Sequence, residues 1–453
     1  MNTKPIIIAG GGLAGSEAAW QIARRGFKVR LYEMRPLKPT LAHKTDHLAE
    51  IVCSNSFKSD QEGTAPWLLK EELKLLDSLL MKIAYETRVP SGASLSVDRE
   101  RFASAVTEAL LGCPNLEIAR EEIRDIPKEE VTILATGPLT SLSMSQSIRE
   151  FAGQEHLYFY DAMSPIVDAE TIDLNKVYRA SRYDKGGADY LNCPLSKQEY
   201  LAFYEALLHA ESVPLHECEK ALYFEACLPI EEMARRGVDT LRYGPMKPVG
   251  LIDPRSGSLP YAAVQLRQET LKAESYNLVG FQNHLRFGEQ ERVFRMIPGL
   301  EQAEFIRFGQ IHRNTFINSP RILSPTLQAK KDPRIFFAGQ ISGVEGYVEC
   351  MATGLIAGIN ATRLASQRPL LVPPRASAIG SLIHYLTCAD PADFQPENIN
   401  FGIMPPAEIG TRAKKIRKQE THFLQVKRAL RELSEFASAV MTESTSRAVK
   451  RNA

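Results

Sequence analysis

The sequence of 453 residues predicts an α/β fold in which a domain built on a parallel sheet is interrupted by an inserted α+β domain. Three observations support this prediction. Residues 6–33 read as a strand, a glycine turn, a helix and a second strand. Two later apolar strands, at 131–134 and 334–337, are each followed by glycine. This alternation of strands and helices is lost between about residues 151 and 294.

The first 33 residues form one βαβ unit. The apolar run Ile6–Ala9 leads directly into Gly10, Gly12 and Gly15, and the second strand ends at Glu33. The G-x-G-x-x-G spacing is typical of Rossmann-like dinucleotide-binding domains, and the alternative is a merely structural glycine turn. Gly10 permits the tight turn, Gly12 lets the backbone approach a pyrophosphate, and Gly15 lets the helix pack closely on the strand. We therefore predict dinucleotide binding, with Glu33 accepting a hydrogen bond from a ribose hydroxyl.

Two later stretches favour FAD over NAD as the tightly held cofactor. Thr136 and Gly137 belong to an Ala-Thr-Gly sequence after the strand at 131–134, as in the two-dinucleotide flavoproteins of glutathione-reductase-like fold. Gly339 and Gln340 follow the late strand at 334–337. Flavoproteins of this class close the flavin site with such a strand and the helix after it.

The turn after Gln340 adds two candidate flavin-site residues. Glu345 and Tyr347 precede a stretch of small residues that predicts a helix at about 349–361. The N-terminal N–H groups of that helix would point at the isoalloxazine ring. Tyr347 would face the ring or, alternatively, pack at the domain joint.

Length and composition are those of an ordinary globular protein, with 44% hydrophobic and 24% charged residues. No apolar run is long enough to span a bilayer, and the chain enters its first strand without a signal peptide, so we expect a cytoplasmic protein. The seven cysteines are odd in number and contain no C-x-x-C, which indicates neither a disulfide framework nor a zinc site. The oligomeric state stays open.

The charge is unevenly distributed. Residues 411–453 hold 11 Lys/Arg against 4 Asp/Glu, a net charge of +7, whereas the whole chain carries +1. This asymmetry hints at a polyanionic partner, although a basic terminal helix is often only a solvated surface. A long helix is expected over 407–436. The basic residues at its start are Arg412, Lys414, Lys415, Arg417 and Lys418.

Two cysteines and one histidine are candidates for chemistry. Cys53 lies in a polar segment with Lys58 five residues later, a setting in which a thiol ionises readily. Cys227 precedes Pro229, which would end a strand and leave the thiol at a strand end or loop. For both, as for the other five cysteines, the alternative is a buried inert side chain. His284 would stack on an aromatic ring or shuttle protons, or else be a hydrogen-bonded structural histidine.

These stretches resemble the TrmFO family, the bacterial folate- and FAD-dependent tRNA (uracil-C5)-methyltransferases. The resemblance runs from the opening glycine motif to about Leu364. Its most specific parts are Cys53–Lys58 and Arg242–Gly250. Three further matching segments are 223–229, 281–290 and 338–347. The C-terminal tail is similar only in character.

The resemblance implies methylation of C5 of the T-loop uridine of tRNA. The carbon would come from methylenetetrahydrofolate, reduced FAD would supply electrons, and NADPH or NADH would regenerate it. Cys227 would add to C6 of the uracil, Cys53 would remove the C5 proton, and His284 would stack on the folate pterin. The basic residues that open the tail helix, residues 412–418, would bind RNA.

The implied organisation is a FAD-binding domain over 1–150, an insertion over 151–294, and a second FAD-binding part with the basic tail over 295–453. Three alternatives stay open. One is the same chemistry on ribosomal RNA. Another is an NAD(P)H-dependent flavin oxidoreductase that acts on a small molecule, and the third is an RNA-binding flavoprotein that has lost catalysis. A related flavoprotein that modifies the tRNA wobble uridine shares the FAD motifs but is usually longer, with a large helical C-terminal domain.

Overall fold

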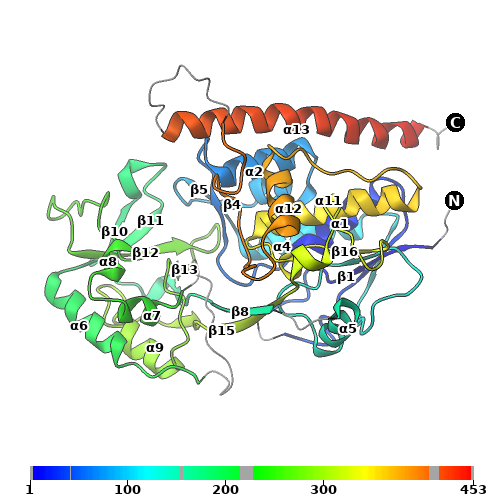
Figure 1. The fold of residues 1–453 in the computed structure, drawn as a ribbon. Coiled ribbons are helices and arrows are strands. Elements are labelled where there is room, and N and C mark those ends of the chain that lie inside the picture. The colour runs from blue at the N-terminus through cyan, green and yellow to red at the C-terminus, as the bar shows by residue number, and fades with distance from the viewer. Residues whose placement is uncertain (1–3, 41, 154–156, 215–227, 408–417, 450–453) are drawn as a thin grey trace.

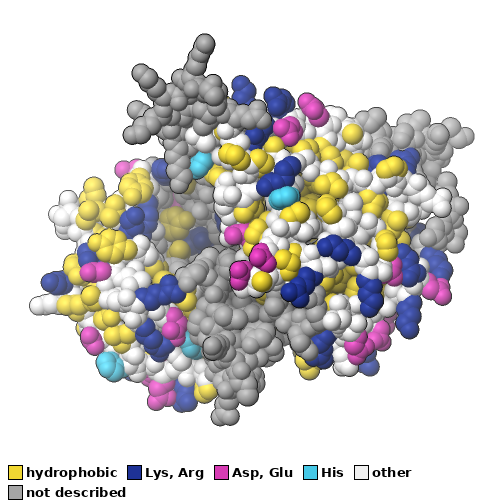
Figure 2. Space-filling model, in the orientation of Figure 1, with side chains coloured by type: hydrophobic (Ala, Val, Ile, Leu, Met, Phe, Trp, Pro, Cys, Tyr) yellow, Lys and Arg dark blue, Asp and Glu magenta, His cyan; other side chains and the backbone are white. Residues whose placement is uncertain are grey.

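The computed structural model describes residues 4–40, 42–153, 157–214, 228–407 and 418–449 (Figure 1). Two bodies lie side by side and are joined by a two-stranded antiparallel ribbon of β8 (Leu157–Ala162) and β15 (Ile311–Phe316). Each body has its own cluster of buried apolar side chains, as expected for separate domains. None of the described helices is long and apolar enough to cross a membrane. On the face drawn in Figure 2, basic and acidic side chains are interspersed with hydrophobic ones.

The larger body is built on a five-stranded sheet of order β16-β7-β1-β2-β6, in which every pairing is parallel. Its strands are β1 (Ile6–Ala9), β2 (Val29–Tyr32), β6 (Leu116–Ala119), β7 (Thr132–Leu134) and β16 (Ile335–Phe337). The predicted α/β class is therefore confirmed, and strands from the two ends of the chain meet in one sheet.

Helix α1 (Leu13–Ala23) follows the glycine turn and packs against α11 (Tyr347–Ala365). Small residues allow this close approach. A Cβ on Gly354 would lie 2.2 Å from the carbonyl oxygen of Ala14, and one on Gly358 would lie 2.9 Å from that of Ala18. The stretch of small residues that predicted a helix at about 349–361 thus forms the surface of α11 that packs against α1.

The apolar residues at 68–84 recur at helical spacing, which alone would predict one helix, but the stretch folds as two helices. α2 (Ala65–Leu75) ends before Asp77, whose φ of 57° is left-handed, and α3 (Leu79–Glu86) starts afterwards. Ser78 caps α3 by accepting a hydrogen bond from the Met81 N–H at 3.2 Å. The spacing of the apolar residues does not reveal this break, because a serine N-cap can separate two helices without disturbing that spacing. Helix α4 (Arg99–Leu111) has Asp98 as its N-cap.

The smaller body is the inserted α+β part. Its six-stranded sheet has the order β10-β11-β12-β13-β9-β14 with antiparallel pairings. The strands are β9 (Ile166–Asp168), β10 (Tyr178–Ala180), β11 (Tyr190–Leu195), β12 (Ala262–Gln268), β13 (Ser275–Leu278) and β14 (Phe305–Arg307). The helices that accompany them are α6 (Lys197–Leu208), α7 (Ile230–Arg235), α8 (Thr240–Tyr243) and α9 (Phe287–Phe294).

The division of the chain at residues 150 and 294 stays a prediction, and the sheet bears on its second boundary. β14 lies beyond residue 294 yet pairs with β9, and the ribbon strand β15 follows it. We propose that the inserted part continues to the ribbon and that the chain returns to the larger body after residue 316.

The remaining elements cover the larger body. They are the small sheet of β3 (Ser56–Ser59), β4 (Arg88–Val89) and β5 (Ser94–Val97), and helices α5 (Leu142–Ala152), α10 (Ser319–Ile322) and α12 (Ala378–Cys388). The C-terminal helix α13 (Lys418–Val449) runs across the top of this body, with Val426 and Leu433 buried in its core (Figure 1). The helix predicted over 407–436 therefore continues further, to Val449; residues 408–417 lie outside the described part.

Candidate active site

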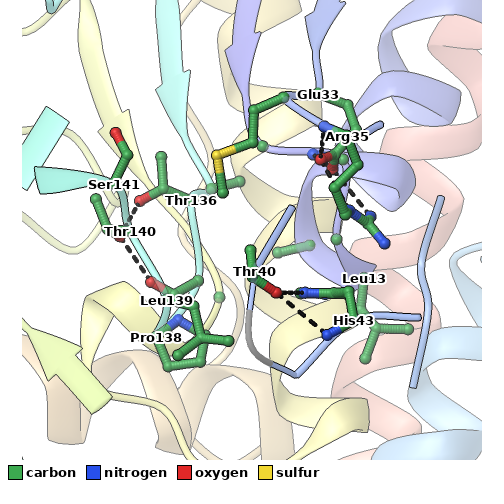
Figure 3. A pocket seen from close by; sticks show the side chains of 18 of the residues that line it. Leu13, Glu33, Arg35, Thr40, His43, Thr136, Pro138, Leu139, Thr140 and Ser141 are labelled. Carbon is green, nitrogen blue, oxygen red and sulfur yellow. Dashed lines mark hydrogen bonds and ion pairs between the residues drawn. The ribbon is translucent and has the colours of Figure 1, made fainter. Parts of the chain in front are cut away.

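A pocket opens at the carboxyl ends of the parallel strands, where the glycine turn, the end of β2 and the end of β7 converge (Figure 3). Ligands of doubly wound sheets bind at this edge. Of the residues predicted to hold a flavin, eight line the pocket: Gly10, Gly12, Glu33, Thr136, Gly137, Gly339, Gln340 and Tyr347. Gly15 and Glu345 are not among the lining residues, although the Glu345 carboxylate accepts a hydrogen bond from the Gln340 amide at 2.7 Å.

The three glycines of the turn have three different surroundings. Gly10 has a φ of 104°, which side chains rarely tolerate. A Cβ on Gly15 would lie 1.9 Å from the Gly10 carbonyl oxygen, so Gly15 allows α1 to meet β1. A Cβ on Gly12 would meet no protein atom within 4 Å. Gly12 therefore faces open space beside the N-terminus of α1, where a pyrophosphate fits.

Glu33 is held as an ionised acceptor at the end of β2. Its carboxylate accepts hydrogen bonds from the Gly11 N–H at 3.2 Å and from the Arg35 Nε at 3.0 Å. Burial alone would raise the pKa of Glu33, but the hydrogen bonds and charge of Arg35 outweigh it and lower the pKa. Arg35 in turn donates to Glu50 at 2.9 Å. Arg35 was not among the predicted site residues, because no motif marks it in the sequence.

Two further pairs border the same pocket (Figure 3). The Thr40 hydroxyl lies 2.6 Å from His43 Nδ1, and the Thr136 hydroxyl lies 2.7 Å from that of Thr140. Both pairs are polar groups on loops that would flank a bound dinucleotide. Neither His43 nor Thr140 was predicted as a site residue.

Cys53 lies beside the end of this pocket. Its backbone N–H donates to the Tyr347 hydroxyl at 3.0 Å, and Tyr347 opens helix α11. The neighbouring Val52 lines the pocket itself. The structure thus brings together Cys53 and Tyr347, which are far apart in sequence.

Two arginines donate hydrogen bonds to backbone carbonyl groups at Cys53 and the residue before it. Arg307, on β14 of the inserted sheet, donates to the carbonyl oxygens of Val52 at 2.9 Å and Cys53 at 3.1 Å. Arg99, at the start of α4, donates to the Cys53 carbonyl at 2.8 Å and pairs with Glu269 at 2.7 Å. Burial, together with repulsion from Arg99, lowers the pKa of Arg307 to about 10. Two cations with one carboxylate leave a surplus positive charge here.

A third arginine fixes the residues that follow. Arg267, on β12, donates to the Ser54 hydroxyl at 2.6 Å and to the Asn55 side-chain oxygen at 2.8 Å. The Cys53 loop is therefore held from both bodies of the molecule. Lys58, the cation predicted to act on Cys53, instead pairs with buried Glu349 at 2.9 Å.

His284 lies in the inserted body and is almost fully buried. Its Nδ1 lies 2.6 Å from the carboxylate of Glu231 on α7, and its backbone N–H donates to the same oxygen at 2.9 Å. It is not among the residues that line the pocket. These contacts match the alternative of a hydrogen-bonded structural histidine, so stacking on a pterin stays a prediction.

Comparison with known proteins decides the family. The model of the family "Glucose inhibited division protein A" matches residues 5–369. A Pelotomaculum thermopropionicum protein named methylenetetrahydrofolate--tRNA-(uracil-5-)-methyltransferase TrmFO is 56% identical over 97% of this chain and 100% of its own length. A Moorella thermoacetica protein of the same name is 57% identical over 89% of this chain and 92% of its own. The chain belongs to the TrmFO family.

A solved structure of GidA from Aquifex aeolicus shares the fold of this TrmFO-family chain. It superposes with a TM-score of 0.67 at 19% identity, covering 96% of this chain and 73% of its own. At this identity the likeness concerns the fold alone, and it agrees with the predicted Rossmann-like domain carrying an insertion.

Several predicted site residues lie outside the described part of the chain. These are Cys227 and the tail residues Arg412, Lys414, Arg417 and Lys415. Lys418 is the first residue of α13.

Of the other cysteines, Cys193 and Cys350 are buried, which raises the pKa of both thiols. Among the described residues, no group of His, Cys, Asp and Glu is arranged to hold a metal ion.

Proposed function

We propose that this protein is a methylenetetrahydrofolate-dependent tRNA (uracil-5-)-methyltransferase that uses FAD and forms 5-methyluridine in the T loop. The observation that carries the proposal is 56% identity, over 97% of this chain, to a relative with that name. The Cys53 loop beside the pocket at the glycine turn supports it from the structure. NADPH or NADH as reductant, and action in the cytoplasm, belong to the same proposal.

The residues of the pocket fit FAD. Gly12 and the N-terminus of α1 would receive the pyrophosphate, the Glu33 carboxylate would accept from ribose hydroxyls, and the α11 N-terminus with Tyr347 would border the isoalloxazine ring. When bound and reduced, FAD supplies the two electrons that turn a methylene carbon into a methyl group.

The chain's own chemistry needs two thiols. C5 of uracil becomes nucleophilic only when a thiolate adds to C6, because the new C–S bond moves the ring electrons toward C5. We assign that addition to Cys227. After C5 has bonded to the folate-derived carbon, its proton must leave to a base, which we assign to Cys53. The folate nitrogen then leaves the methylene carbon, and reduction of that carbon to a methyl group releases Cys227 from C6. Arg99 and Arg307 both donate to the Cys53 carbonyl and place two cations beside this residue.

The proposed activity is tested by incubating the protein with methylenetetrahydrofolate, NADPH and an unmodified tRNA transcript. We expect 5-methyluridine at the T-loop position, and less of it on a ribosomal RNA fragment. Oxidation of NADPH at full rate without RNA, and without any methylated product, would instead favour a small-molecule flavin oxidoreductase.

Replacing Arg307 by methionine is expected to lower the methylation rate about 100-fold with flavin content unchanged. The change removes both donors to the Val52 and Cys53 carbonyls, and a small displacement of a reacting group has a cost of this order. Single-turnover methylation with saturating RNA measures it. Arg334→Met is the matched control, because the Arg334 guanidinium pairs with Asp332 at the surface, away from the Cys53 loop. A normal rate for Arg307→Met would contradict the proposed support of Cys53.

The basic start of the tail is expected to add sequence-independent affinity for RNA. Deleting α13 would expose the core that it covers, so we propose charge removal instead: Gln at Arg412, Lys414, Lys415, Arg417 and Lys418. Fewer phosphate contacts release fewer counterions, so the RNA dissociation constant should rise at low salt and depend less steeply on salt. An unchanged affinity and salt slope would leave the tail as a solvated helix end.

A further inference from the structure

Three phenylalanine rings form a parallel stack at the edge of the inserted body. The ring centroids of Phe287 and Phe308 are 4.6 Å apart, those of Phe308 and Phe305 are 5.3 Å apart, and both interplanar angles are 15°. The inner end is fixed, because Phe305 also contacts the fully buried ring of Phe294 at 6.4 Å. The outer end is open, since half of Phe287 is exposed to solvent.

This stack is close in sequence to residues of both candidate chemical groups. Phe308 follows Arg307, whose guanidinium reaches the Cys53 loop. Phe287 opens α9, three residues after His284. The stack is therefore linked through the chain to Arg307, which contacts the Cys53 loop, and to His284. The match to the TrmFO family includes the Phe287 segment, but the proposed chemistry uses none of these rings.

We propose that the open face of Phe287 receives a nucleobase of the RNA substrate, next to the target uridine. The inference rests on the proposed function for the presence of RNA. Nucleobases stack on exposed aromatic rings regardless of sequence, and a stack already rooted in the core loses little freedom on binding. The site is thus a stacking platform for an unpaired base of a loop.

The surroundings suit RNA. Arg286 precedes Phe287, and its guanidinium is largely exposed, in a surface pair with Glu211 at 2.8 Å. Such an exposed pair contributes little, so the guanidinium is available to a phosphate. Ile306 is also well exposed and lies between the stacked residues Phe305 and Phe308 in sequence. A planar apolar face beside an exposed cation is the combination that single-stranded nucleic acid requires.

The test compares four full-length proteins: wild type, Phe287→Leu, Phe287→Trp and Tyr243→Ala. Leucine keeps apolar bulk without a ring, and tryptophan restores a stacking surface. Tyr243, on α8 of the same body, is even more exposed and serves as the control. The measurements are the dissociation constant for a fluorescent T-arm hairpin RNA and the KM for methylenetetrahydrofolate.

We expect Phe287→Leu to weaken RNA binding about tenfold, Phe287→Trp and Tyr243→Ala to bind as wild type, and the folate KM to stay constant. Unchanged RNA affinity in Phe287→Leu would overturn the platform while leaving the proposed function intact. A raised folate KM with normal RNA affinity would also overturn it, because the ring would then serve the folate. A wild type that neither binds nor methylates the hairpin would remove the proposed function itself.

Discussion

Replacing Gly12 by valine is expected to give a folded but colourless protein, whereas we expect the wild type to be isolated yellow with FAD bound non-covalently. The backbone at Gly12 is extended, with φ −73° and ψ −169°, so valine fits it without strain. A Cβ there meets no protein atom within 4 Å. The new side chain therefore starts in space that no protein atom fills, where a pyrophosphate would lie.

The measurement is flavin absorbance per protein after purification, together with a thermal melt. Gly15→Ala supplies the contrast, because its Cβ would lie 1.9 Å from the Gly10 carbonyl oxygen and must push α1 away from β1. We expect Gly15→Ala to melt earlier than Gly12→Val. Full flavin content in Gly12→Val would contradict the assignment of the pyrophosphate to this turn.

Replacing Cys227 by serine is expected to abolish both methylation and covalent capture of RNA that carries 5-fluorouridine at the target position. Fluorine replaces the proton that must leave C5, so the C–S adduct at C6 should accumulate as a species stable in denaturant. Gel electrophoresis under denaturing conditions detects that species. The oxygen of serine is too weak a nucleophile at neutral pH to replace the thiolate.

Cys53→Ala separates the two roles. Methylation should be lost, because the base for the C5 proton is missing, yet the adduct through Cys227 should still form, since that step does not use the base. Capture by Cys227→Ser but not by Cys53→Ala would show that the two roles are reversed. Normal 5-methyluridine formation by both variants would refute the assignment of chemistry to these cysteines.

The parts of the fold that sequence predicted are those fixed by neighbouring residues. Sequence patterns predicted one pocket from three features: the glycine spacing, Glu33 and the Thr136–Gly137 turn. The structure brings all three to the same edge of the sheet. The run of small residues in α11 likewise predicted a helix from neighbouring residues alone. Predictions of this kind depend on backbone conformation and close packing, which a few adjacent residues determine.

What sequence did not predict depends on contacts between distant residues. Arg267 and Arg307 support the Cys53 loop from strands more than 200 residues away, and an isolated arginine carries no motif. The partner of His284, Glu231, lies 53 residues earlier, so its buried pairing was equally invisible. Lys58 was predicted to promote ionisation of Cys53 because it is close in sequence, but in the fold it pairs with Glu349.

The origin of the transferred carbon tests the central claim most directly. The wild-type protein would be incubated with NADPH, unmodified tRNA, methylenetetrahydrofolate isotopically labelled at its methylene carbon, and unlabelled S-adenosylmethionine. The nucleosides would then be analysed by mass spectrometry. The account predicts labelled 5-methyluridine whose formation requires Cys53. Unlabelled 5-methyluridine, or labelled product formed equally well by Cys53→Ala, would contradict it.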